Sequence, residues 1–240
     1  MRVAPPGRVT DALPTGHDSK AVDFPLLLIE GLRKQWAQRP PVLDDISLAL
    51  PPSTLMLLVG RNGVGKTTLL RILAGVICPD RGTVALGGLR PRRNRREYAR
   101  RIGFLSAHQG GLYPRLTGRQ HLEFWARIAF IPQNLRATAI EKAVERFALG
   151  EFLAQRADRI SMGQRQRLRL ALTFLHDPSL ILLDEPRNSL DSAGVALLLD
   201  VLADCRARGG AAIWCSPTGD DSVSEADLRY ELVGGKLELL

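Results

Sequence analysis

The chain has 240 residues, 45% of them hydrophobic, which is enough for one large globular domain or two small ones. No stretch approaches eighteen uninterrupted apolar residues, so we expect no membrane-spanning helix. The net charge is +8, and 28 of the 33 basic residues are arginines, a balance compatible with nucleic acid, an anionic membrane surface or codon bias.

The cysteines and the N-terminus indicate the cellular compartment in which the chain works. Cys78, Cys205 and Cys215 are odd in number and lack CxxC spacing, so the sequence predicts neither a disulfide framework nor a zinc site, and a reducing cytosol fits. Residues 1–22 contain no apolar core of a secretory signal. Their Pro, Gly, Asp and Ser content indicates a mobile leader.

The first half of the chain alternates short apolar runs with turns. Strands are predicted over 24–32, 44–50, 55–60, 83–88 and 101–106, with a helix over 66–77. The arginine-rich stretch 89–101 has Tyr98 as its only aromatic residue. It therefore reads as a solvated connection rather than a single-strand nucleic acid binder, and we expect no nucleic acid partner.

The middle of the chain reads as helical, and the end returns to strands. Helices are predicted over 117–130, 135–149 and 161–175, the first with a capping box from Thr117 to Gln120. A strand over 180–184, a helix over 192–209, a strand over 211–215 and a hairpin around Gly234–Gly235 follow. This alternation predicts an α/β fold with a mainly parallel sheet, flanking helices and an inserted helical subdomain.

The segment "GRNGVGKTT", residues 60–68, matches the P-loop pattern. Glycines let backbone N–H groups turn inward around phosphate oxygens, and the following helix presents its positive end to the same anion. Lys66 would reach the β- and γ-phosphates, and the Thr67 hydroxyl would hold Mg²⁺. We therefore expect ATP to contact Gly60, Asn62, Gly63, Val64, Gly65, Lys66, Thr67 and Thr68.

A second acidic site follows the buried strand "LILLD". Asp184 ends this strand and is placed to hold Mg²⁺, and Glu185 comes next, where it can orient the attacking water or accept its proton. An acidic pair after a strand can also be a plain helix cap, but the P-loop upstream favours the catalytic interpretation.

The segment "SMGQ", residues 161–164, stands at a predicted helix start just before the acidic strand. It resembles the LSGGQ signature of ATP-binding cassette (ABC) ATPases, with Met162 in place of a glycine. "RNSLD", ending in Asp191, looks like that family's D-loop, and Trp36 looks like its adenine-stacking aromatic residue. The resemblance covers residues 26 to about 235.

The resemblance implies an ABC-type P-loop NTPase with an antiparallel β subdomain and a helical subdomain at about 110–160, in one ATPase domain spanning 23–240. It implies a dimer in which Ser161, Gly163 and Gln164 of one protomer close on ATP held by the other. It also implies a metal-linked catalytic glutamine, for which "AHQGGLYP" offers Gln109, as in cytochrome-c-maturation haem exporter ATPases. His108 stays open as a loop residue or a catalytic one.

The strand at 211–215 ends where the family has a switch histidine that contacts the γ-phosphate. Pro217 aligns with that position, and no histidine follows His176 in the chain. Proline has no side-chain donor and no N–H, so the resemblance implies a slow enzyme. Ser216 or Thr218 could supply a hydroxyl instead.

The implied function is that of the ATPase subunit of an ABC exporter. It would act as a homodimer at the cytoplasmic face of the cell membrane, on a permease encoded as a separate chain. Phe124 and Trp125 could contact that permease or pack within the helical subdomain. Two alternatives are a soluble ABC ATPase of DNA repair or translation, and a regulatory nucleotide-binding module with weak turnover.

Overall fold

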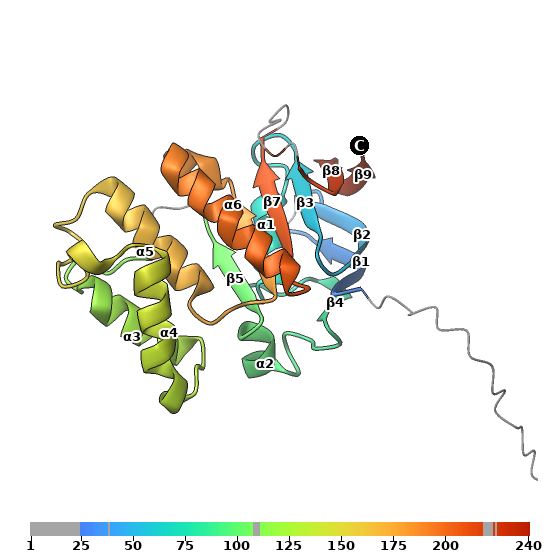
Figure 1. Cartoon of the computed structure of the whole chain (residues 1–240). Helices are drawn as coiled ribbons and strands as arrows, with labels where there is room; N and C mark the ends of the chain where they lie inside the picture. The colour runs from blue at the N-terminus through green and yellow to red at the C-terminus, as the bar shows by residue number, and fades with distance from the viewer. Residues whose placement is uncertain (1–24, 38, 108–110, 218–222, 224) are drawn as a thin grey trace, which may run out of the picture.

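The structure is a computed structural model that describes residues 25–37, 39–107, 111–217, 223 and 225–240 (Figure 1). The predictions for the leader at 1–22, for His108 and Gln109 and for Thr218 lie outside these residues. Within the described part of the chain, no helix combines the length and the apolar character needed to cross a bilayer.

A six-stranded sheet forms the centre of the molecule, in the order β5-β6-β7-β3-β8-β9. All neighbouring strands are parallel except the last pair, the predicted terminal hairpin. The mainly parallel sheet is therefore confirmed. Its strands are β3 (Leu55–Val59), β5 (Ile102–Leu105), β6 (Leu180–Asp184), β7 (Ala211–Ser216), β8 (Leu228–Val233) and β9 (Lys236–Leu239).

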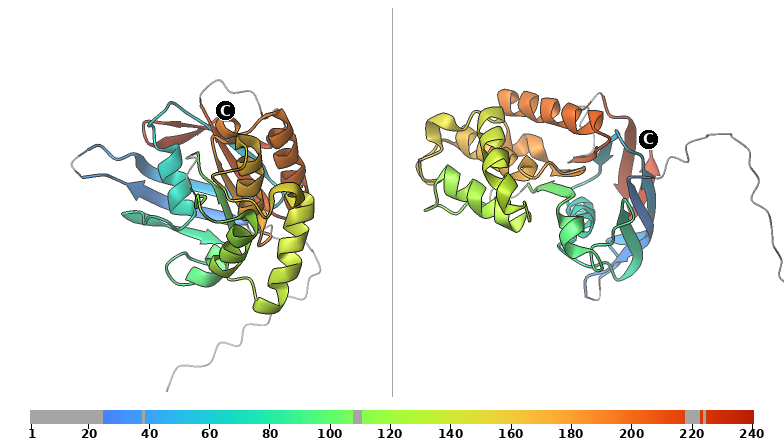
Figure 2. Two further views of the ribbon diagram at one scale, coloured as in Figure 1. Left: turned by 90° about the vertical axis from the view of Figure 1, so that its left-hand side faces the viewer. Right: turned by 60° about the horizontal axis from the view of Figure 1, so that its bottom comes forward.

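A smaller antiparallel sheet has the order β2-β1-β4. Its strands are β1 (Leu27–Lys34), β2 (Leu43–Leu50) and β4 (Arg81–Leu86). In Figure 1 and in the right-hand view of Figure 2, these strands lie at the opposite end of the molecule from α3 and α4. The antiparallel β subdomain that the family resemblance implies is thus present.

Helices cover the central sheet and form a group of their own. Helix α1 (Lys66–Leu73) follows β3, and α6 (Ser192–Ala207) follows β6. Between β5 and β6 the chain builds α3 (Gly118–Ile128), α4 (Gln133–Arg146), a short 3₁₀ turn at Gly150–Phe152 and α5 (Met162–Phe174), and a second 3₁₀ turn at Pro186–Ser189 joins β6 to α6. Figure 1 shows α3, α4 and α5 gathered at one end of the molecule.

Side chains of the central strands alternate between two apolar cores. On β7, Trp214 packs in the core that contains α5 and α6, whereas Ile213 and Cys215 pack in the core that contains α1 and the antiparallel sheet. The same alternation runs along β6, where Leu183 faces the first core and Leu182 the second. Alternate residues of a strand point to opposite faces, so this register decides which face each strand-end residue occupies.

Two segments differ from the sequence prediction. Helix α1, which follows the P-loop, ends at Leu73 rather than at residue 77, because the chain turns at Gly75 with a positive φ of 69°. Residues Arg95–Ala99, predicted as a connection, form the short helix α2. Its Tyr98 is buried and donates its hydroxyl to the Leu73 carbonyl at 2.6 Å, while the arginines of this stretch are exposed.

The predicted capping box at the start of α3 is confirmed. The Thr117 hydroxyl accepts from the Gln120 N–H at 3.2 Å, and the Gln120 side chain accepts from the Thr117 N–H at 2.9 Å. One turn later His121 is fully buried. Its Nδ1 lies 2.8 Å from the Thr117 carbonyl, and its Nε2 accepts from the Tyr113 N–H at 2.8 Å, which fixes the neutral tautomer with a proton on Nδ1.

His121 and His176 make the stability of the fold depend on pH. Burial lowers the pKa of both side chains. Each therefore binds fewer protons in the folded chain than in the unfolded chain, where its pKa is about 6.5. The stabilising effect is complete above this pH and is lost as pH falls below it.

We expect the free energy of unfolding to fall between pH 7 and pH 5. Replacing either histidine by glutamine (His121→Gln, His176→Gln) should remove up to about 1.4 kcal/mol per pH unit from this slope, because one titrating group is lost. Urea unfolding at several pH values measures it. A slope unchanged in both variants would show that other groups control the acid sensitivity.

Candidate functional site

The loop from Gly60 to Gly65 joins β3 to α1 and requires glycine at both ends. Gly60 and Gly65 have φ angles of 155° and 123°. A Cβ on Gly65 would lie 2.8 Å from the Val42 carbonyl oxygen, and one on Gly60 would lie 2.9 Å from that of Leu232. The backbone of the loop is therefore held against Val42, the residue before β2, and against Leu232 of β8, which gives it one fixed curvature.

The start of α1 is suited to an anion. Gly65 offers no side-chain cap, so the first N–H groups of the helix are left for a ligand or solvent. Lys66 is 4% exposed, and its ammonium donates to the carbonyls of Gly60 at 2.5 Å and Arg61 at 3.3 Å. The positive charge is thus held inside the curve of the loop.

Asp184 reaches the same place from the end of β6. The strand alternation puts it on the α1 face of the sheet, where its carboxylate accepts from the Thr67 hydroxyl at 3.0 and 3.1 Å. Asp184 is 2% exposed. A hydroxyl and a carboxylate are hard oxygen donors of the kind that Mg²⁺ takes from a protein when substrate phosphates complete its shell.

Glu185 stands at the turn after β6 in a left-handed conformation, with φ 48° and ψ 54°. Its N–H donates to the Cys215 carbonyl at 3.1 Å, which keeps the turn against β7. Its carboxylate lies 3.8 Å from the Lys66 ammonium. A non-glycine residue in this conformation costs about 1–2 kcal/mol, so the turn is maintained by its surroundings and aims the carboxylate at the loop.

The loop, the start of α1 and Glu185 surround one cavity of about 180 Å³, which we call the phosphate cavity, and Asp184 lies beside it through its contact with Thr67. The residues that line it are Asn62, Gly63, Gly65, Lys66, Thr67, Thr68 and Glu185. The structure therefore brings together the P-loop and the acidic residues that the sequence predicted 118 positions apart. No group of three His, Cys, Asp or Glu side chains suited to a metal occurs among the described residues, so a metal here would depend on ligands from the substrate and water.

The end of β7 lies beside this cavity. Ser216 pairs with Val59 and Cys215 with Asp184, so Pro217 leaves the sheet at the edge where the P-loop begins. Pro217 is exposed. Burial and the neighbouring Asp184 carboxylate raise the pKa of the Cys215 thiol, which therefore stays protonated.

Ser216 is placed differently from the hydroxyl that the sequence offered as a substitute. It is 2% exposed, and its oxygen accepts from the Trp214 indole N–H at 3.0 Å. Both side chains lie on the α6 face of β7, opposite to Asp184. Ser216 does not line the phosphate cavity.

The start of α5 is a second capping box, one that the sequence analysis did not identify although Ser161 and Gln164 have the required spacing. The Ser161 hydroxyl accepts from the Gln164 N–H at 3.2 Å, and the Gln164 side-chain oxygen accepts from the Ser161 N–H at 2.9 Å. Both groups use acceptor atoms, so the serine O–H and the glutamine NH₂ remain donors. Met162 beside them is 50% exposed.

Asp191 caps α6 and lies close to the signature helix. Its Oδ1 accepts from the Gly194 N–H at 2.7 Å, and a Cβ added to Gly163 would lie 3.8 Å from its Oδ2. The structure thus brings Gly163 and Asp191 together. The residues that line the phosphate cavity do not include Ser161, Gly163, Gln164 or Asp191.

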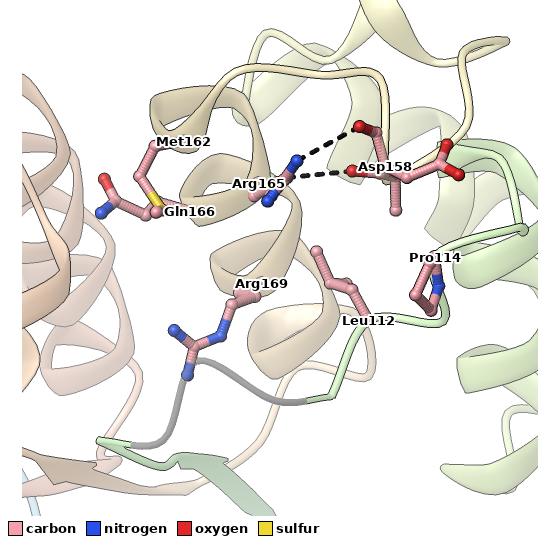
Figure 3. Close-up of a pocket in the computed structure, with 8 residues that line it drawn as sticks. Leu112, Pro114, Asp158, Met162, Arg165, Gln166 and Arg169 are labelled. Carbon is pink, nitrogen blue, oxygen red and sulfur yellow. Dashed lines mark hydrogen bonds between the residues drawn. The ribbon is translucent and has the colours of Figure 1, made fainter.

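Two arginines of α5, which sequence reasoning missed, fasten the helix to its surroundings (Figure 3). Arg165 donates to the carbonyls of Ala157 at 2.9 Å and Asp158 at 3.3 Å, and Arg169 donates to that of Ser106 at 2.6 Å. Burial lowers the pKa of Arg169. They line a cavity of about 190 Å³ between α5 and the segment after β5. The only signal for these contacts in the sequence is the four-residue spacing of the two arginines in "RQRLR".

Trp36 follows β1 and lies apart from the phosphate cavity lining. Its ring is 45% exposed, and the Lys34 ammonium lies 4.7 Å from the ring centroid. Lys34 is in turn held by Asp80 at 2.8 Å. The exposed ring surface is available for stacking.

Comparison with known proteins identifies relatives of this arrangement. Residues 43–188 match the family model described as ABC transporter. The chain is 33% identical over 147 residues to the ABC transporter ATP-binding protein NatA of Bacillus subtilis, a match covering 61% of this chain and 60% of NatA. It is 36% identical over 172 residues to the cytochrome c biogenesis ATP-binding export protein CcmA 2 of Cupriavidus metallidurans, covering 72% and 80%.

The fold also has solved counterparts. A dimeric structure of a post-hydrolysis state of the ATP-binding cassette MJ0796, bound to ADP and Pi, matches with a TM-score of 0.76 and 21% identity, covering 88% of this chain and 96% of that one. At this identity the likeness shows the fold alone. The family match over more than half of the sequence carries the assignment, and this chain belongs to the ABC transporter family of ATP-binding proteins.

Proposed function

We propose that this chain is the ATP-hydrolysing subunit of an ABC exporter, working as an ATP-dependent homodimer on a permease encoded separately. The observation that carries the proposal is the grouping of four side chains at one cavity: Lys66, Thr67 and Glu185 line it, and Asp184 accepts a hydrogen bond from Thr67 beside it. The family to which the chain belongs binds and hydrolyses ATP. The assignment of these residues to steps of the reaction is our inference.

ATP binding is assigned to the P-loop. Backbone N–H groups at the start of α1 and the Lys66 ammonium face one point, where the β- and γ-phosphates would replace the loop carbonyls as partners of the lysine. Asn62, Gly63, Val64 and Thr68 would complete the phosphate cradle. The Trp36 ring would stack on adenine.

Mg²⁺ is assigned to the Thr67 hydroxyl and the Asp184 carboxylate, which already lie within 3.1 Å of one another. Bound there with the phosphates, the ion would neutralise charge on the transferring phosphoryl group. Gln109 is proposed as a further contact from the segment after β5.

Glu185 is assigned to the attacking water. Its carboxylate would accept a proton from the water as the water oxygen bonds to the γ-phosphorus and the bond to the β-phosphate oxygen breaks, giving ADP and phosphate. Lys66 would stabilise the negative charge on the leaving oxygens. The distance of 3.8 Å between the Lys66 ammonium and the Glu185 carboxylate supports the action of both groups on one substrate.

The residues at the start of α5, together with Asp191, are assigned to the contact with a partner protomer. Ser161 and Gln164 keep donor hydrogens free of the capping box, and Gly163 leaves the backbone of α5 open beside Asp191. Because these residues do not line the phosphate cavity of their own chain, we infer that they close on the γ-phosphate of a second copy. The dimeric likeness of the MJ0796 cassette supports this arrangement.

The permease is assigned to the helical group at about 110–160. Phe124 and Trp125 are half-buried and pack with Tyr113 and His121, so part of each ring remains for a partner. The similarity to CcmA 2, a cytochrome c biogenesis ATP-binding export protein, supports export. We further propose residues 23–240 as one ATPase domain after a leader of 22 residues, at the cytoplasmic face of the membrane.

A regulatory module with little turnover is the second candidate, and Pro217 favours it. The proline leaves the sheet beside the P-loop and offers no donor to the γ-phosphate. Glu185 is retained, so we favour a slow enzyme over an inactive one.

The assignment of the lysine and the glutamate is tested by two variants. Lys66→Ala should weaken ATP binding roughly ten- to hundredfold, because the phosphate charge loses its buried partner. Glu185→Gln should keep ATP and accumulate a dimer, because binding survives without proton removal. Equilibrium ATP binding and size-exclusion chromatography measure both, with the exposed Lys236→Ala and Glu238→Gln as controls. Wild-type affinity in Lys66→Ala would contradict the site.

The permease assignment predicts co-purification. The tagged chain, isolated from detergent-solubilised cells of its source, should carry an integral membrane protein encoded beside it, and its ATPase rate should rise in that complex. Double replacement of Phe124 and Trp125 by alanine should release the membrane protein while leaving ATP affinity unchanged. Full activity in a preparation free of any membrane protein would instead favour a soluble ABC ATPase.

Pro217 predicts slow hydrolysis with ordinary ATP affinity. One missing donor to the transition state costs on the order of 3 kcal/mol, about a hundredfold in rate. Pro217→His should raise kcat with little change in KM, and Pro217→Ala, which restores the backbone N–H but adds no side-chain donor, should not. If neither substitution changes kcat from the wild-type value, another group makes the contact with the γ-phosphate.

A further inference from the structure

A cavity larger than the two above lies away from the nucleotide site. It has a volume of about 440 Å³, within the range of small-molecule sites. One wall is α4, and other lining residues include Arg100, His176 and Arg208, which precede β5, β6 and β7. These connections enter the parallel strands at the edge opposite the P-loop. In Figure 1 the strand arrows point upward and α2 lies below them.

The lining of this cavity carries excess positive charge. Arg100, Lys142, Arg146 and Arg208 line it, against Asp177 as its one acidic residue. Arg208 pairs with Asp177, and Arg146 pairs with Asp204. Arg100 and Lys142 make no ion pair with any described residue, so two cations remain for a ligand.

The same cavity has an apolar wall. Leu135 and Ala139 of α4 face Phe147, Phe174 and Leu175 across it. Leu135 is 51% exposed, so about half of its surface is open to a ligand on this side of the cavity. A ligand that filled this side would remove hydrocarbon surface from water, whereas a small inorganic ion would leave it exposed.

His176 gives the cavity a buried polar atom. Its Nε2 lies 2.9 Å from the Ile102 carbonyl, which is an acceptor, so Nε2 carries the proton. Its Nδ1 is buried and has no hydrogen-bond partner among the described residues. The charged groups around the ring are Arg100, Asp177 and Arg208.

We propose that this cavity binds an amphiphilic organic anion, with its phosphate, sulfate or carboxylate group between Arg100 and Lys142 and its hydrocarbon part against Leu135 and the phenylalanines. The site stands on charge, volume and apolar lining at the far edge of the sheet. It does not depend on the proposed reaction at the P-loop. The ligand could be a free metabolite or the head of a membrane lipid, which share this chemistry.

Octyl phosphate below its micelle concentration is the probe, with the full chain saturated with ADP so that the P-loop is occupied. The ring signals of His176 in NMR report this site separately from the nucleotide. We expect saturable shifts with octyl phosphate, and at least about tenfold weaker binding of octyl glucoside, which lacks the charge, and of inorganic phosphate, which lacks the chain.

Variants test the two halves of the cavity. Arg100→Gln and Lys142→Gln should each weaken octyl phosphate about tenfold, and Leu135→Gln should weaken it by a similar factor. These side chains are exposed, so the fold should persist, as ADP affinity will show. Lys236→Gln removes the same charge elsewhere and should bind as the wild type does. Variants at Arg100 and Lys142 that bind normally would overturn the proposal.

Vesicles separate the two sources. If phosphatidylglycerol vesicles, but not phosphatidylcholine vesicles, move the His176 signals and compete with octyl phosphate, the site takes a lipid head group. If only the free amphiphile moves them, the site takes a soluble ligand. Equal binding of octyl glucoside, or unmoved His176 signals with every probe, would show that the cavity is not an anion site.

Discussion

The contact between the Thr67 hydroxyl and the Asp184 carboxylate depends on the register of the central sheet. Strand β7 lies between β3 and β6, and all three run in the same direction, so their ends reach one edge. A one-residue shift of β6 would turn Asp184 to the α6 face and put Leu183 beside α1. Alternating apolar residues prevent that shift, because each face of β6 fits a different core.

The same register explains why the side chains of Cys215 and Ser216 have different surroundings. They are neighbours in sequence, but one lies beside Asp184 and the other is bonded to Trp214 on the opposite face. A buried thiol and a buried hydroxyl therefore flank the site without entering the phosphate cavity. Neither side chain lines the phosphate cavity, so on our proposal any contact from this strand end to a nucleotide comes from Pro217 or the residues after it.

Local sequence predicted much of this arrangement. The P-loop, the acidic strand end and the box at Thr117 are each contained in a few consecutive residues, and each has a physical signature that short-range spacing preserves. The β subdomain was inferred from family resemblance. The helix α2 was missed because it is five residues long and depends on the bond from Tyr98 to Leu73, 25 positions away.

The far-edge cavity was also beyond sequence reasoning. Its lining comes from α4, the end of α5 and the connections that precede α4, β5, β6 and β7, and no single segment has an unusual composition. The bonds from Arg165 and Arg169 were missed for a similar reason, because their acceptors are backbone carbonyls, which carry no side-chain signal. Residues 108–110, with Gln109, lie outside the described structure, so their part of the site rests on resemblance.

Arg165 and Arg169 give α5 two anchors one turn apart. Arg165 binds the carbonyl of Ala157 in the segment that leads to Ser161, and Arg169 binds the carbonyl of Ser106 just after β5. A displacement of the start of α5 therefore has to break or carry with it both sets of hydrogen bonds. We expect the segment that holds Ser161 and the exit of β5 to move together, because the half-buried Arg169 links α5 to Ser106.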